Sequence, residues 1–260
     1  PDGEQQRTAA RNFGLTHGND LHALGVNINF APVVDLRRHA QRGLFDRYSF
    51  IGSRAISMDP EKTAEIATAY AQGLLAGGVL PTLKHFPGLG RVRTDTHFFS
   101  ARFDTPLNEL SATDFRPFAE TLQRTPALLM VGHAYVSELD ARELASTSAK
   151  VVRGLLRETW RHEGVVITDD LCMLPTYYAR GGIGGAARRA LAADVDLVLV
   201  SYDGRQVIEV LTALHEAADS GELSAAQLQR SAARLARMRV EIQNRRGGTI
   251  PSDLLDQTGY

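Results

Sequence analysis

The stretch Gly164-Val165-Val166-Ile167-Thr168, followed at once by Asp169-Asp170, decides the fold that we expect for this chain. A short run of β-branched residues bounded by glycine and by acidic residues predicts a buried strand. Similar apolar runs lie at 26–31, 78–83, 127–131 and 195–200. Stretches of helical periodicity separate these runs, and this alternation is typical of βα units around a parallel sheet.

The helical stretches complete the expected domain. Helices are predicted at 60–76, 111–124, 150–162, 185–193, 204–220 and 224–243. Asp59-Pro60 resembles an N-cap followed by proline at the first helical position. The length of 260 residues also fits one α/β barrel of roughly 250 residues. We therefore expect a single TIM-type (β/α) barrel domain over residues 1–245 and a C-terminal tail over 246–260.

Composition excludes several classes of protein. Hydrophobic residues make up 43% and charged residues 23% of the chain, which are globular values. The formal net charge of −1 provides no basic field for a nucleic acid. No uninterrupted apolar run reaches the roughly 18 residues of a membrane span. The single cysteine, Cys172, forms no internal disulfide, so we expect a reducing, cytoplasmic location.

Polar residues follow each predicted strand. They are Asp35, Lys84-His85, His133, Asp169-Asp170 and Ser201-Tyr202-Asp203. Because ligands of parallel α/β folds bind at the carboxyl ends of the strands, we expect these side chains to converge on one face. Long glycine-containing loops at 37–57 and 88–105 are typical of functional loops.

One motif on a long loop and one residue at a strand end indicate acid–base and nucleophilic chemistry. Asp95-Thr96-His97 lies on the loop after Lys84-His85, and an aspartate near a histidine orients the ring and raises its basicity. Asp-x-His is also common by chance. Asp169 suits nucleophilic attack on an acetal carbon, whereas Asp170 is expected to brace a loop or cap the next helix.

A metal site is the alternative use of the same side chains. Asp35, His85, His97, His133 and Asp169 have the chemistry to surround a Zn²⁺ or Mg²⁺ ion. However, no His-x-His pair ends a strand, so we expect no metal and no other cofactor. The glycine-rich stretch 181–185 follows no strand and is interpreted as a loop leading into the helix at 185.

Four ordered motifs between about Leu21 and Val200 resemble the family 3 glycoside hydrolases, and more narrowly their bacterial β-N-acetylglucosaminidase branch. The motifs are Phe30-Ala31-Pro32-Val33-Val34-Asp35, Lys84-His85-Phe86-Pro87-Gly88, Asp95-Thr96-His97 and Thr168-Asp169-Asp170-Leu171.

The resemblance implies a role for each site residue. Asp169 is the expected nucleophile, and His97 with Asp95 is the expected acid–base dyad. Lys84, His85 and Arg54 are expected to bind substrate hydroxyl groups. Asp35 and His133, which also end strands, complete the expected substrate-binding set.

The function implied is that of a retaining exo-glycosidase that releases terminal N-acetyl-β-D-glucosamine from cell-wall fragments in peptidoglycan recycling. Its partner is a small carbohydrate, with no nucleic acid and no membrane. Three alternatives stay open at this point: a phosphorylase, a non-catalytic sugar-binding homologue and a metal-dependent barrel hydrolase.

The chain departs from the family pattern at three places. Leu89 stands where the family commonly has histidine, and Ala55-Ile56-Ser57 replaces Ser-Phe-Gly after Arg54. Members of the branch also begin with two further βα units, the second carrying Asp-x-Glu-Gly-Gly, which is absent from this sequence. We therefore expect a barrel that lacks its first one or two βα units.

Overall fold

A computed structural model describes residues 3–37, 51–92 and 95–246. At its centre is a five-stranded sheet of order β1-β2-β4-β6-β7, and every neighbouring pair is parallel. The strands are β1 (Ile28–Asn29), β2 (Leu80–Phe86), β4 (Leu128–Val131), β6 (Val166–Asp170) and β7 (Leu197–Leu199). The structure confirms all five predicted strands, each displaced or shortened by a few residues.

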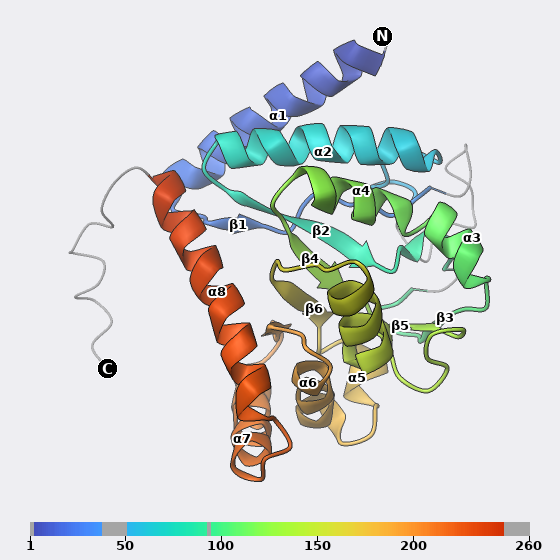
Figure 1. The fold of residues 1–260 in the computed structure, drawn as a ribbon, viewed down its shortest axis with the longest axis vertical. Helices are drawn as coiled ribbons and strands as arrows, with labels where there is room; N and C mark the ends of the chain where they lie inside the picture. The colour runs from blue at the N-terminus through green and yellow to red at the C-terminus, as the bar shows by residue number, and fades with distance from the viewer. Residues whose placement is uncertain (1–2, 38–50, 93–94, 247–260) are drawn as a thin grey trace.

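The sheet is curled like part of a barrel, with helices over its outer side (Figure 1). Its strands follow one another in chain order, as the crossovers of a βα barrel require. Within the described residues β1 and β7 are the two edges and do not pair with each other. The predicted TIM-type fold is therefore confirmed in part: the described residues form half of a barrel, and they do not close it.

Besides two short 3-10 turns, nine helices precede, connect or follow the strands within the described residues. They are α1 (Gly3–Ala23), α2 (Pro60–Ala76), α3 (Leu107–Ala112), α4 (Arg116–Arg124), a wide π-type helix (Lys150–Thr159), α5 (Leu174–Tyr177), α6 (Gly182–Ala192), α7 (Gly204–Asp219) and α8 (Ala225–Arg246). Asp59 caps α2 as predicted, since its side chain accepts hydrogen bonds from the amides of Glu61 and Lys62. Residues 247–260 of the predicted tail lie outside the described part.

Two helix predictions were wrong in detail. The helix expected at 111–124 is interrupted between α3 and α4, because Pro117 disfavours helical backbone before it and begins a new helix. The glycine stretch expected as a loop is largely the first turn of α6. There the Cβ of a residue at Gly184 would lie 2.9 Å from the Cβ of Ala213 in α7, so the glycine permits close packing of the two helices.

A second, two-stranded parallel sheet was not predicted. It pairs β3 (Ala101–Phe103), within the segment expected as a long loop, with β5 (Ala134–Val136). Ser137 continues the pairing by donating its amide to the carbonyl of Phe103 at 3.0 Å. The long connection after β2 is thereby held against the segment that follows β4.

The main core lies between the sheet and the helices on its outer side. The Phe86 ring is fully buried at the end of β2. Its centroid lies 5.1 Å from that of Phe115, 5.5 Å from Phe118 and 5.4 Å from Trp160. These contacts connect β2 with α4 and the end of the π-type helix, and aromatic clusters of this kind contribute much of a core's stability.

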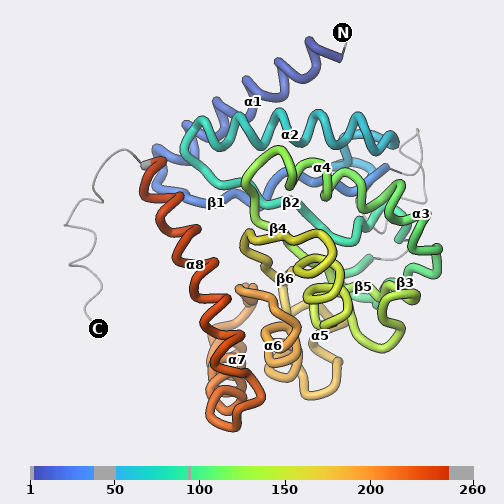
Figure 2. Tube along the Cα trace, viewed as in Figure 1, coloured from blue at the N-terminus to red at the C-terminus, as the bar shows by residue number. Residues whose placement is uncertain are grey.

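Helix α8 covers the end of the sheet at which the strands begin (Figures 1 and 2). Its Leu235, Met238 and Ile242 pack on a cluster of Leu75, Leu80, Leu128 and Val165. Consequently the opposite end, where the strands finish, is the one left for a site.

Candidate active site

Two β-bulges mark the strand ends at which the predicted site residues lie. Between β2 and β4 the register advances from Leu83↔Leu129 to Phe86↔Val131, which leaves an extra residue on β2 at Lys84-His85. Between β6 and β7 it advances from Ile167↔Leu197 to Asp170↔Leu199, which leaves an extra residue at Thr168-Asp169. A bulge turns side chains away from the regular alternation. Lys84-His85 and Thr168-Asp169 therefore lie on bulged backbone, outside the regular alternation of a strand.

Asp35 holds His85 in place. The Asp35 carboxylate is completely buried and accepts hydrogen bonds from the His85 amide at 3.2 Å, the Leu89 amide at 2.7 Å and the His85 ring Nδ1 at 2.8 Å. Since a carboxylate only accepts, Nδ1 carries the proton and Nε2 is left for another partner. These contacts support a positioning role for Asp35, and its expected contact with substrate stays a prediction.

Asp169 lies at the end of β6 among groups that stabilise its negative charge. Burial acts to raise its pKa, but His85, the Asp170 amide and Lys84 act in the other direction. The Asp170 amide donates to Asp169 Oδ1 at 2.9 Å. The net result is a pKa of Asp169 below its usual value, so the carboxylate is ionised at neutral pH.

Asp170 braces the loop after β6, as predicted. Its carboxylate accepts hydrogen bonds from the Cys172 amide at 3.0 Å, from the Ser201 amide at 3.3 Å and from the Ser201 hydroxyl. These contacts tie the turn after β6 to the segment after β7. The two neighbouring acids therefore have different surroundings.

His133 is hydrogen-bonded to the backbone next to Asp169. It is completely buried, its Nε2 donates to the Asp170 carbonyl at 3.0 Å, and its Nδ1 lies 2.8 Å from the Ser146 hydroxyl. Burial lowers the pKa of His133, and the neighbouring carboxylate of Asp169 opposes this only in part. The ring is thus neutral, with the proton on Nε2 and Ser146 donating to Nδ1. Its expected contact with substrate stays a prediction.

The Asp95–His97 pair is formed as the sequence suggested. His97 Nδ1 lies 2.6 Å from Asp95 Oδ1, and the His97 amide donates to the same oxygen at 2.9 Å. The His97 ring is largely exposed and its Nε2 is not held by this pair. The His97 carbonyl accepts the Leu174 amide at 3.0 Å, which attaches this loop to the segment that follows Asp169.

Lys84 and Arg54 add positive charge to the same face. Burial and the Arg54 guanidinium lower the pKa of Lys84, while the carboxylates of Asp169 and Asp35 act to raise it. Arg54 lies in an exposed turn whose amide donates to the Ile51 carbonyl at 2.9 Å. The structure thus brings Lys84, Arg54, Asp35 and Asp169 within electrostatic reach of one another, although they come from four segments.

The set of metal-binding candidates is not assembled as one. Among the residues that the structure describes, no three His, Cys, Asp or Glu side chains are grouped to hold a metal ion.

The helices of the described ranges include none with the length and apolar character that crossing a membrane requires.

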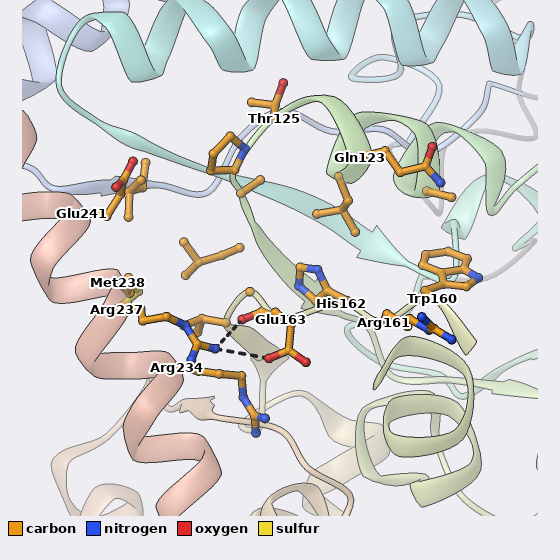
Figure 3. A pocket seen from close by; sticks show the side chains of 18 of the residues that line it. Gln123, Thr125, Trp160, Arg161, His162, Glu163, Arg234, Arg237, Met238 and Glu241 are labelled. Atoms are coloured by element: carbon orange, nitrogen blue, oxygen red, sulfur yellow. Dashed lines mark hydrogen bonds and ion pairs between the residues drawn. The ribbon is translucent and has the colours of Figure 1, made fainter. Parts of the chain in front are cut away.

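A separate cavity of about 680 Å³ lies at the opposite end of the sheet. Figure 3 shows it between α8, which contributes Arg234, Arg237 and Met238, and the turn that carries His162 and Glu163. Arg237 spans part of this space to reach Glu163 at 3.3 Å. Because Leu80 and Leu128 line it at the beginnings of β2 and β4, the cavity is remote from the carboxyl ends of the strands.

Sequence reasoning missed two kinds of contributor. Ser146, which supports His133, belongs to no motif with a recognisable spacing, whereas Ser201 was expected on the strand-end face but without its contact to Asp170. The two bulges were missed because register depends on the partner strand. Only the position of Ser201 directly after the last predicted strand offered a signal for it.

Known proteins share both the sequence and the fold. Residues 3–238 match the family described as glycosyl hydrolase family 3 N terminal domain. Beta-hexosaminidase LpqI of Mycobacterium tuberculosis is 36% identical over 242 residues, which cover 90% of this chain and 60% of that protein. A beta-hexosaminidase of Xanthomonas oryzae pv. oryzae is 36% identical over 199 residues, 76% of this chain and 57% of that protein.

Solved structures agree with these matches. A glycoside hydrolase family 3 beta-N-acetylglucosaminidase from Paenibacillus sp. superimposes with a TM-score of 0.85 at 30% identity, over 96% of this chain and 45% of that one. A beta-N-acetylhexosaminidase from Beutenbergia cavernae gives a TM-score of 0.81 at 30% identity, over 92% and 71% of the two chains. The chain spans 57–60% of the length of the curated relatives named above. By its sequence and its fold, the chain belongs to glycosyl hydrolase family 3 and matches the N-terminal domain of that family.

Proposed function

We propose that this protein is a retaining exo-glycosidase that releases terminal N-acetyl-β-D-glucosamine. The observation that carries the proposal is the pairing of an ionised carboxylate, Asp169, with the Asp95–His97 dyad on a loop hydrogen-bonded to the segment after β6. The names of the relatives, beta-hexosaminidase and beta-N-acetylglucosaminidase, support the same chemistry.

In the first step Asp169 attacks the anomeric carbon and the glycosidic C–O bond breaks. His97, protonated on both ring nitrogens, gives its Nε2 proton to the leaving oxygen. Its Nδ1–H remains hydrogen-bonded to the Asp95 carboxylate. The products are a glycosyl ester on Asp169, a free alcohol and a neutral His97. Asp95 stabilises the imidazolium form before the proton leaves.

In the second step water attacks the same carbon. Neutral His97 accepts a water proton on Nε2, the ester bond to Asp169 breaks, and the carboxylate and the imidazolium are restored. Two displacements at one carbon retain the β configuration. The acetamido group of the sugar is bound but does not act as nucleophile, because Asp169 occupies that role.

The cationic and histidine side chains are suited to holding the terminal sugar. Lys84 Nζ and the free Nε2 of His85 are the groups that we assign to its hydroxyls, with Arg54 contributing from its turn. Fragments of cell-wall peptidoglycan, which contain β-linked N-acetylglucosamine, are the natural substrates that we propose.

The first test replaces the nucleophile. Asp169→Asn keeps the shape of the side chain but removes the charge, and we expect hydrolysis of an aryl N-acetyl-β-glucosaminide to fall by about a thousandfold or more. Asp59→Asn is the matched control, because asparagine also caps a helix N-terminus well. Unchanged turnover in Asp169→Asn would contradict the proposal.

Product analysis tests the finer assignment. NMR of the first-formed sugar should show the β anomer if the mechanism is retaining. Turnover in phosphate compared with a phosphate-free buffer distinguishes hydrolysis from phosphorolysis, since only a phosphorylase forms the sugar phosphate. Binding of the sugar without any product would support the non-catalytic alternative.

A further inference from the structure

The cavity between α8 and the turn that carries His162 takes no part in the proposed catalysis. Its volume of about 680 Å³ falls within the range of about 300–1,000 Å³ that small-molecule sites occupy. Much of its wall is apolar, formed by Leu80, Leu122, Leu128, Val165, Met238 and the ring of Trp160. We call this space the α8 cavity. A wall of this composition favours a ligand with an apolar body.

One buried polar atom in this wall lacks a hydrogen-bond partner. Among the described residues, no donor or acceptor is hydrogen-bonded to Nε2 of His162. The ring lies against Gly164, which also lines the cavity, since a Cβ at Gly164 would be 2.9 Å from Nε2. Figure 3 places the ring between α8 and Trp160. Because an unpaired buried polar group is unfavourable, a ligand that pairs with Nε2 gains affinity.

The turn that carries His162 is held in place by the protein itself. The Arg157 guanidinium donates to the carbonyl of His162 at 2.8 Å, to that of Gly164 at 2.6 Å and to Asp196 Oδ2 at 2.6 Å. Arg234 of α8 donates to the other oxygen of Asp196 at 2.8 Å. Asp196 thus joins the two sides of the cavity. A preformed site of this kind loses little affinity to the ordering of its own residues.

The charges around the cavity indicate an uncharged ligand. Burial, with the charges of Arg157 and Arg234, lowers the pKa of His162 to about 3, so its ring is neutral. A fully charged lining residue, Arg161, is exposed to solvent. The other charged lining residues already form ion pairs: Arg234 with Asp194 and Asp196, Arg237 with Glu163, and Glu241 with Arg245. An ionic ligand would therefore lose its hydration without gaining an unpaired counter-charge.

A hydroxyl group is the partner that suits a neutral imidazole in either tautomer. Nε2 donates when it carries the ring proton and accepts when Nδ1 carries it, and a hydroxyl group can do the opposite in each case. We propose that the α8 cavity binds an uncharged, largely apolar alcohol whose hydroxyl group is hydrogen-bonded to His162. This site is separate from the candidate active site, and the inference does not rest on the proposed function.

Trp160 offers a direct measurement of binding, because it lines the cavity and is the one tryptophan of the chain. Bromine quenches the fluorescence of an indole ring on contact. We expect 4-bromobenzyl alcohol to quench Trp160 in a saturable manner, and 4-bromobenzoate, which has the same ring but a negative charge, to bind more weakly. Quenching by the alcohol that stays linear would overturn the site. Equal Kd values for the two compounds would overturn the uncharged class of ligand.

His162→Phe tests the hydrogen bond, because phenylalanine keeps an aromatic ring but lacks Nε2. We expect the ratio of Kd values, 4-bromobenzyl alcohol to 4-bromotoluene, to rise by about 2- to 12-fold, the range of one net hydrogen bond. His22→Phe is the matched control. Within the described ranges His22 Nδ1 is likewise buried without a partner, but it belongs to α1 and does not line the cavity. Equal ratios in the two variants would overturn the role of His162.

Ala119→Phe tests the location, since Ala119 lines the cavity from α4 and a phenyl group there occupies the space of the ligand. With the fold verified by circular dichroism, we expect the saturable quenching to be lost, and a wild-type Kd would overturn the location. Competition tests the location without any variant. N-acetyl-D-glucosamine should leave the wild-type titration unchanged, whereas displacement of the alcohol would place it in the candidate active site and overturn the inference.

Discussion

His133 shows how much of the candidate site is built from buried support. Both of its ring nitrogens are hydrogen-bonded within the protein, because one donates to the Asp170 carbonyl and the other accepts from Ser146. The ring therefore fixes the peptide that follows Asp169. We infer that this chain of hydrogen bonds orients the nucleophile, while Lys84 and the free nitrogen of His85 face the sugar.

Ser146→Ala tests this positioning role. The variant leaves His133 Nδ1 without its partner, and we expect kcat to fall about three- to tenfold with little change in KM, since one hydrogen bond contributes roughly 1 kcal/mol. Steady-state kinetics on an aryl glycoside measures the two constants. Ser148→Ala is the matched control, because Ser148 is equally buried but donates to Asp140. Equal kinetics in the two variants would reject the positioning role.

At the scale of elements, close packing of α1 on α2 explains four glycines. Helices α1 and α2 lie against each other (Figure 2). Gly14 and Gly18 on α1 face Gly73, in α2, and Gly77, which follows it. The Cβ of a residue at Gly73 would lie 2.2 Å from the Arg11 carbonyl oxygen, and one at Gly14 would lie 2.2 Å from the Tyr70 carbonyl oxygen. The two backbones are therefore in direct contact, and no side chain fits between them.

Gly73→Ala should separate these helices. Alanine favours an isolated helix, but here its methyl group meets backbone, and we expect the free energy of unfolding to fall by about 1–3 kcal/mol. Urea unfolding followed by circular dichroism measures the change. Gly204→Ala serves as the control, because nothing lies within 4 Å of its Cβ position. A Gly73 variant as stable as wild type would show that the helices adjust freely.

At the scale of the whole molecule, buried charges join the end of the chain to the sheet. Arg234 of α8 contacts Asp196 at 2.8 Å and Asp194 at 3.2 Å, and Arg157 contacts Asp196 at 2.6 Å. The same arginines are part of the reason why His162 stays neutral: burial, with the charges of Arg157 and Arg234, lowers the pKa of His162 to about 3. A histidine with a low pKa in the folded state favours unfolding in acid.

The lowered pKa values of His133 and His162 make the folded protein less stable as the pH falls. Between the unfolded pKa of about 6.5 and the lower folded pKa, the unfolded chain binds more protons, so stability falls as the pH falls. His162 contributes a slope of up to about 1.4 kcal/mol per pH unit, and His133, whose pKa is also lowered, contributes in the same direction. Urea unfolding between pH 7 and pH 5 measures it, in a range above the titration of ordinary carboxylates. His162→Gln should reduce this slope by up to about 1.4 kcal/mol per pH unit, and an unchanged slope would refute the assignment.

The sequence by itself determined the βα order, the five strands of the curled sheet and the identity of the polar residues at the strand ends. These are local properties: β-branched runs form strands, and the chain must cross back to begin each parallel strand. The Asp95–His97 pair was accessible for the same reason, because two residues of separation place it within one turn.

Tertiary structure alone decided how those residues are used. The bulges at Lys84-His85 and Thr168-Asp169 depend on the neighbouring strands, and the different surroundings of Asp169 and Asp170 depend on His133, Ser201 and Lys84. The half-barrel also depends on which strand edges find partners. Register, burial and charge environment are sums over segments far apart in the chain, and no local pattern in the sequence contains them.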